Sequence, residues 1–136
     1  MKPTESELEI LHILWEKGPA TVRAVNDLLN ERRKSGVSAA RGKESAGYTT
    51  TLKLMQIMFE KGLVTRTEDG RTHTYTAAVR QEDTQSLLLQ QFVDNTFRGS
   101  AARLVMQALG NHEASAEELD EIKALIAQIE QNQPKP

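Results

Sequence analysis

Apolar residues recur at helical spacing along the first part of the chain and predict two short helices. The first stripe comprises Leu8, Ile10, Leu11, Leu14 and Trp15. Thr4-Glu5-Ser6-Glu7 is a capping box directly ahead of this stripe, and Lys17-Gly18-Pro19 is typical of a helix end. A second helix is expected after the capping residue Thr21. Its buried face comprises Val22, Val25, Leu28 and Leu29.

A third amphipathic helix is predicted from Thr49 to Lys61. Its buried face has the spacing i, i+3, i+4 and i+7, and comprises Thr51, Leu54, Met55 and Met58. The opposite face comprises Thr49, Leu52, Lys53, Gln56 and Glu60. These side chains are short or polar near the amino end of the helix, where a helix bound in a DNA groove reads the bases. Gly62 ends the helix.

Two threonine-rich extended runs, 63–68 and 71–76, follow this helix and predict a β-hairpin. Asp69-Gly70 between them suits the positive φ values of a two-residue type I′ turn. The hairpin is expected to bring Arg66, Arg71 and His73 close together. A groove-reading helix followed directly by a basic hairpin is the plan of a winged helix.

The stretch 34–47, ahead of the third helix, consists mainly of small and charged residues and is expected to be a loop. Two interpretations stay open. The loop is either a solvated connector or a flexible basic arm that touches phosphates.

The pattern after Val79 is helical again and predicts three helices. Arg98-Gly99 separates the first from the second, Gly110 ends the second, and Ser115-Ala116-Glu117-Glu118 is a capping box for the third. These helices are too thin for an independent core but carry regular apolar stripes, so a second copy could cover them. Folding back onto the first domain is the alternative. The expected dimerisation residues are Leu88, Phe92, Leu104, Leu119, Ile122, Leu125, Ile126 and Ile129.

The expected fold is therefore mainly α with a small β-hairpin wing. Residues 1–80 would form a winged helix-turn-helix DNA-binding domain, and residues 81–136 a helical dimerisation region. The charge distribution agrees with this division. The formal net charge is −2, yet residues 32–80 hold 10 Lys and Arg against 4 Asp and Glu, whereas residues 81–136 hold 4 against 9. A basic middle fits a nucleic-acid surface, although two randomly uneven halves would look the same.

Composition excludes several other classes of protein. The chain has no cysteine, so disulfides, thiolate metal sites and cysteine nucleophiles are excluded. There is no signal-peptide core and no apolar run near the roughly 20 residues needed to span a bilayer, so a cytoplasmic protein without membrane contact is expected.

Catalysis, a metal site and a cofactor are not expected. His12, His73 and His112 are scattered along the chain and have no carboxylate at triad or ligand spacing. His112, Glu113 and Glu117 are better explained by a loop and a helix cap than by a metal.

The winged-helix plan makes nine side chains candidates for contacts to double-stranded DNA. Affinity for DNA comes largely from neutralised phosphates, and sequence is read at base edges in the major groove. The candidates are Tyr48, Thr49, Thr50, Leu52, Lys53, Gln56, Arg66, Arg71 and His73. Helix capping and ordinary exposure would explain the threonines and Leu52 taken singly. A winged helix used as a protein-interaction module, without sequence-specific DNA binding, is the alternative function.

Several of these motifs, taken in order, resemble the penicillinase repressor family of the BlaI, MecI and CopY type. The motifs are Glu7-Leu8-Glu9-Ile10-Leu11, Leu14-Trp15, Tyr48-Thr49-Thr50, Glu60-Lys61-Gly62-Leu63-Val64, and Asp69-Gly70-Arg71 ahead of Tyr75. The resemblance implies a cytoplasmic bacterial transcriptional repressor. It also implies a winged-helix homodimer on a palindromic operator, joined through its carboxyl-terminal helices.

The chain departs from the family pattern in four places. Ile57 stands where an arginine is usual, and the 34–47 loop is longer than usual. The asparagine-phenylalanine bond cut in β-lactam-responsive members is absent from the matching stretch, Val105-Met106-Gln107-Ala108. The tail cysteines of copper-responsive members are absent too. Neither the β-lactam signal nor the copper signal can therefore be carried over to this chain. A regulatory protease is kept as a candidate partner.

Overall fold

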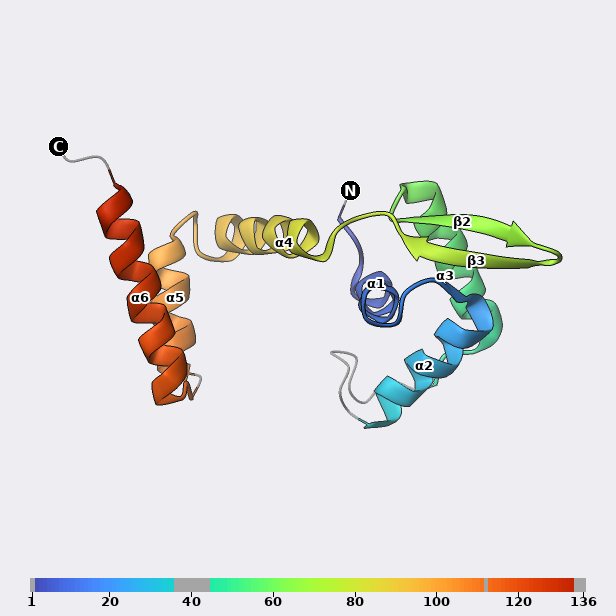
Figure 1. Ribbon diagram of the computed structural model, residues 1–136, viewed down its shortest axis with the longest axis horizontal. Helices are drawn as coiled ribbons and strands as arrows, with labels where there is room; N and C mark the ends of the chain where they lie inside the picture. Colours follow the sequence, from blue (N-terminus) through green and yellow to red (C-terminus); the bar gives the residue numbers. More distant parts are fainter. Residues whose placement is uncertain (1, 36–44, 112, 134–136) are drawn as a thin grey trace. The chain divides into compact units, whose positions relative to one another are not determined.

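The computed structural model describes residues 2–35, 45–111 and 113–133 (Figure 1). The chain divides into two units, Met1–Leu89 and Gln90–Pro136. Residues 36–44 of the predicted loop and His112 lie outside the described residues, so neither interpretation of that loop is tested. The predicted fold class is confirmed: the described residues form helices and one small antiparallel sheet.

The first unit begins with α1, Glu5–Lys17, at the predicted capping box. The Thr4 hydroxyl accepts from the Glu7 backbone N–H at 3.2 Å, and the Glu7 carboxylate accepts from the Thr4 N–H at 2.8 Å. The helix ends at Gly18, whose φ of 86° favours glycine.

Two more helices of the first unit follow, α2, Val22–Ser35, and α3, Tyr48–Lys61. Apolar faces from α1, α2 and α3 and from the sheet enclose one core. Its buried members are Ile10, Leu11, Ile13, Leu14, Val22, Val25, Leu29, Met55, Met58, Leu63, Val64 and Tyr75. On α3, Thr51 is buried as predicted, while Leu54 is only half-buried.

The wing is part of a three-stranded sheet in the order β1-β3-β2. The predicted hairpin is formed by β2, Val64–Asp69, and β3, Thr72–Ala77. The two-residue strand β1, Ala20–Thr21, pairs with β3 and was not predicted. It carries too few residues for an alternating pattern.

The predicted type I′ turn at Asp69-Gly70 is wrong by one residue. Asp69 pairs with Thr72, so Gly70 and Arg71 connect the strands. Of these two residues, only Gly70 has a positive φ, at 66°. A type I′ turn needs positive φ at both central residues, whereas glycine at the first alone is typical of type II′.

Two nearly buried carboxylates join the helices of the first unit. Glu7 on α1 accepts from the Lys61 ammonium group on α3 at 2.8 and 3.0 Å. Glu9, also on α1, pairs with Arg33 on α2 at 3.1 Å. A buried carboxylate is strongly unfavourable without a partner, so these pairs fix which residues of the three helices lie together.

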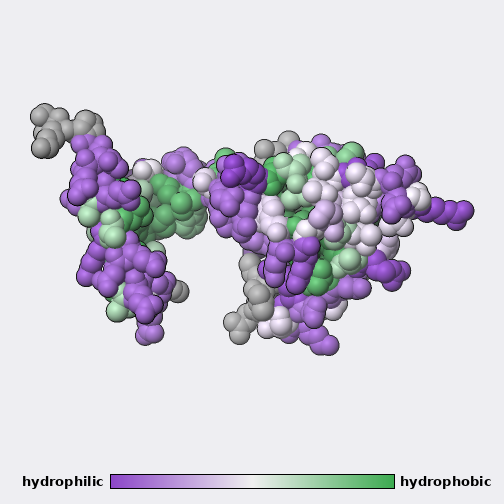
Figure 2. All heavy atoms as spheres, in the orientation of Figure 1, coloured by the Kyte–Doolittle hydropathy of each residue, from purple (hydrophilic) through white to green (hydrophobic). Residues whose placement is uncertain are grey.

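The second unit contains the end of α4, Gln81–Thr96, with α5, Ala101–Asn111, and α6, Ala116–Asn132. The predicted break between α4 and α5 is present, with positive φ at Arg98 and Gly99. The predicted capping box at Ser115 is also present, at the start of α6. Gly110 does not end the second helix, because α5 continues to Asn111. Neither α5 nor α6 has a buried residue. Figure 2 shows hydrophobic residues exposed between hydrophilic ones on these helices. No helix in the described ranges is long and apolar enough to cross a membrane.

The Glu7–Lys61 pair makes the stability of the first unit depend on pH. Burial alone would raise the pKa of Glu7, but its bonds to Lys61 and Thr4 hold that pKa below the ordinary value of 4.5. A carboxylate with a lowered pKa stabilises the fold fully above its unfolded pKa. This contribution is lost as the pH falls through the folded pKa.

We predict that Lys61→Met lowers the free energy of unfolding because it leaves the Glu7 carboxylate without its cation. Removing one partner of a buried pair costs about 3–5 kcal/mol, and the partial exposure of Lys61 reduces the expected loss to about 2–3 kcal/mol at pH 7. Urea unfolding measures the loss. The matched control is Lys17→Met, an exposed lysine that also lies at a helix end. The difference from wild type should shrink below about pH 4.5; a difference independent of pH would contradict this role of Glu7.

Candidate nucleic-acid interface

The amino end of α3 is held by two asparagines of α2. The Asn30 amide donates to the Ala46 carbonyl oxygen at 3.0 Å, and its own oxygen accepts from the Ala46 N–H at 2.6 Å. The Asn26 amide lies 2.6 Å from the buried Thr51 hydroxyl. The orientation that satisfies both ends of this amide also lets it donate to the carbonyl oxygens of Ala46 and Gly47. The start of α3 is therefore fixed by α2.

The outer face of α3 carries the predicted helix candidates. Thr49, Thr50 and Lys53 are exposed, as is Gln56. Leu52 is half-buried and packs partly against the core, so only part of its side chain is open to a ligand.

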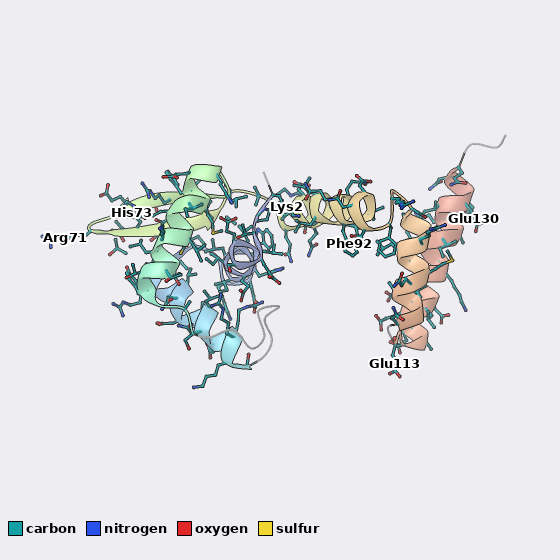
Figure 3. The ribbon with its side chains drawn as sticks, turned by 180° about the vertical axis from the view of Figure 1, so that it is seen from behind. Lys2, Arg71, His73, Phe92, Glu113 and Glu130 are labelled. Carbon is teal, nitrogen blue, oxygen red and sulfur yellow. The ribbon has the colours of Figure 1, made fainter. Side chains whose placement is uncertain are left out.

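The three candidates of the wing lie at different positions along the hairpin. Arg66 pairs with Tyr75 across the hairpin, and His73 pairs with Glu68. Arg71 is in the turn itself, and Figure 3 shows it at the end of the hairpin with His73 further along the strand.

A hollow of about 560 Å³ lies between α3 and the wing. Six of the nine candidates line it, and Thr49, Thr50 and Lys53 do not. The lining residues are Thr21, Val22, Arg23, Tyr48, Leu52, Gln56, Arg66, Arg71, Thr72, His73 and Tyr75. The hollow thus joins the groove-facing side of α3 to the basic residues of the hairpin.

The lining of this hollow is cationic. It includes three arginines and a histidine, and none of its described residues is an aspartate or glutamate. Converging arginines without carboxylates suit a polyanion such as a phosphate backbone.

Sequence reasoning missed Arg23, which enters the hollow from the first turn of α2. No local signal marks it, because it is 25 positions from Tyr48 in the chain and the two meet only after folding. A basic residue on the polar side of a helix is ordinarily a solvated one.

The other titratable groups do not suggest catalysis. Within residues 2–35, 45–111 and 113–133, no group of three or more His, Cys, Asp or Glu could hold a metal ion. His12 stacks edge-on against Trp15, with ring centroids 5.3 Å apart. Burial, and then the charge of Arg32, lower the pKa of His12 and so favour its neutral imidazole. His12 is therefore explained by packing.

The family model described as penicillinase repressor matches residues 3–128. The chain belongs to the penicillinase repressor family. The penicillinase repressor of Bacillus licheniformis is 21% identical over 124 residues, covering 90% of this chain and 88% of that one. The methicillin resistance regulatory protein MecI of Staphylococcus aureus (strain N315) is 20% identical, covering 90% and 91%. The transcriptional regulator BlaI of Mycobacterium tuberculosis (strain ATCC 25618 / H37Rv) is 26% identical, covering 91% and 82%.

The predicted resemblance is confirmed by these matches. The family consists of DNA-binding transcriptional repressors, so the prediction that the chain is not an enzyme is confirmed by its family membership.

We predict that Asn26→Ala lowers the free energy of unfolding by about 1–3 kcal/mol, because the buried Thr51 hydroxyl loses its partner. Asp27→Ala is the matched control, since Asp27 is the next residue of α2 and is exposed. Urea unfolding of both variants measures the difference. Equal stability of the two variants would show that the Asn26 bond does not hold the start of α3.

Proposed function

We propose that this protein is a sequence-specific transcriptional repressor that binds a palindromic operator as a homodimer. The observation that carries the proposal is the hollow between α3 and the wing, which combines a helix face with three arginines and has no carboxylate among its described lining residues. Family membership gives the same class of function independently.

In the proposed complex, α3 enters the major groove. Gln56 offers an amide that suits a base edge, and the exposed part of Leu52 can meet a thymine methyl group. Thr49, Thr50 and Lys53, exposed on the same helix but outside the hollow, would contact phosphates or flanking bases. The wing would bring Arg66, Arg71 and His73 to the backbone or minor groove.

Dimerisation is proposed through the second region, with residues 1–80 binding DNA and residues 81–136 joining the copies. The residues proposed for this interface are half-buried or exposed in the single chain: Leu88, Phe92, Leu104, Leu119, Ile122, Leu125, Ile126 and Ile129. Monomeric soluble proteins rarely leave such stripes open to water. A twofold dimer would place its two recognition helices about one turn of DNA, or a multiple of it, apart, and so read an inverted repeat.

A regulatory protease is a second partner compatible with this proposal. Val105 and Met106 are exposed on α5, in the stretch that matches the cleavage site of β-lactam-responsive members. Because the Asn-Phe bond is absent there, such a protease would have a different specificity.

We predict that Arg66→Ala and Arg71→Ala each weaken binding to all duplexes and lower the salt slope of log K by about one unit, because each removes one phosphate contact. Fluorescence anisotropy with operator and random duplexes over a salt series measures both effects. Lys17→Ala, at the far end of α1, is the control of equal charge change. Unchanged slopes would remove both arginines from the interface. No binding of wild-type protein to any duplex at low salt would favour the protein-interaction alternative.

We predict that Ile122→Glu with Ile126→Glu separates the dimer, because charged side chains on the apolar stripe of α6 cannot be covered by a partner. A monomer bound to one half-site also lacks the second, linked contact that a dimer makes. Most of the operator affinity should therefore be lost. Sedimentation velocity measures the association state. Ala124→Glu, about opposite this stripe on the helix, is the matched control. A dimer that persists in the double variant would place the interface elsewhere.

A further inference from the structure

Two exposed aromatic residues mark the ends of one face of α3. Tyr48 is the first residue of the helix and is 46% exposed, and Phe59, near its last turn, is 38% exposed. Eleven residues separate them, which is close to three full turns, so both side chains leave the helix in nearly the same direction. Leu52 and Gln56 lie between them on this face.

An arginine from a different element lies over each ring. The Arg23 guanidinium carbon, from α2, is 5.7 Å from the centroid of Tyr48. The Arg66 guanidinium carbon, from β2, is 4.1 Å from the centroid of Phe59. Both distances are within the range of cation–π attraction.

Neither arginine has a carboxylate partner among the described residues. A ring beneath a guanidinium group restricts its rotamers but leaves its N–H donors open at the edge. Such an arginine can bind an anion with little further loss of side-chain entropy.

The spacing of the two aromatic rings along α3, beneath their arginines, suits duplex DNA. Eleven residues of α-helix span about 16 Å along the axis. The major groove of B-DNA is about 12 Å wide, so the ends of a helix lying across it reach the two bordering phosphate backbones. Leu52 and Gln56 would then face the bases.

We propose that Arg23 and Arg66 form an arginine clamp that binds one phosphate at each border of the major groove. Tyr48 and Phe59 are positioning residues in this clamp, since each holds its arginine over the groove. The inference rests on the proposed function, and it adds Arg23 to the interface and gives Tyr48 and Phe59 their roles. Arg71, at the wing turn, lies outside the clamp.

The first test compares Arg23→Ala, Arg66→Ala and the double variant by anisotropy with a random-sequence duplex over a salt series. Each single variant is expected to lower the salt slope by about one unit, and the double variant by about two, because separate phosphates are released. Arg23→Lys should keep the slope, because its charge remains. A double variant that loses only one unit would show that the arginines share a phosphate and would overturn the clamp.

The second test uses double-mutant cycles for the positioning residues. Phe59→Leu keeps an apolar side chain but removes the ring, and should weaken binding about two- to fivefold, the effect of an exposed cation–π contact. The same substitution in the Arg66→Ala background should have no effect, whereas a purely structural role of Phe59 would persist there. Tyr48→Leu and Arg23→Ala form the corresponding cycle. Additive effects in both cycles would refute the positioning role.

The outcomes separate the clamp from the proposed function. If wild-type protein binds no duplex at low salt, both the clamp and the repressor function are refuted. If wild-type protein binds with a steep salt slope and Arg23→Ala leaves this slope unchanged, the clamp is refuted. The repressor function is not affected by that outcome. Thermal unfolding of each variant, compared with wild type, checks that the exposed substitutions leave the fold intact.

Discussion

The placement of α3 depends on the buried carboxylate of Glu7. One of its oxygens accepts from the Thr4 backbone N–H and from the Lys61 ammonium group, so the first turn of α1 and the last residue of α3 are fixed together. At the other end of α3, the Asn26 amide meets the buried Thr51 hydroxyl. Because unpaired buried polar groups are costly, both ends of the helix are determined by the core rather than by its exposed surface. The exposed outer face of α3 therefore takes little part in holding the helix in place.

The charge of the chain is informative only where the fold collects it. A net charge of −2 gives no indication of a polyanionic partner. The hollow between α3 and the wing nevertheless gathers Arg23 from α2, Arg66 from β2 and Arg71 from the hairpin turn, and no described carboxylate lines it. Local potential, not net charge, governs the approach of DNA to such a surface.

The two regions of the chain expose opposite kinds of surface. The first unit has a buried apolar core and a hollow lined by three arginines, whereas α5 and α6 have no buried residues in the single chain. Association of two copies would remove apolar area from water and link two DNA-binding surfaces at once.

The sequence by itself determined the elements whose signals are local. The capping boxes at Thr4 and Ser115 and the apolar periodicity of α1 to α3 depend on residues three or four positions apart. The order of motifs that indicated the family is likewise read directly along the chain. Only the tertiary structure decided that Arg23 shares a hollow with the wing, that Arg66 lies over Phe59, and that the hairpin turns at Gly70. Contacts such as Glu7 to Lys61 join residues 54 positions apart. Such pairs leave no periodic trace along the chain, because packing of the core, not local backbone preference, brings them together.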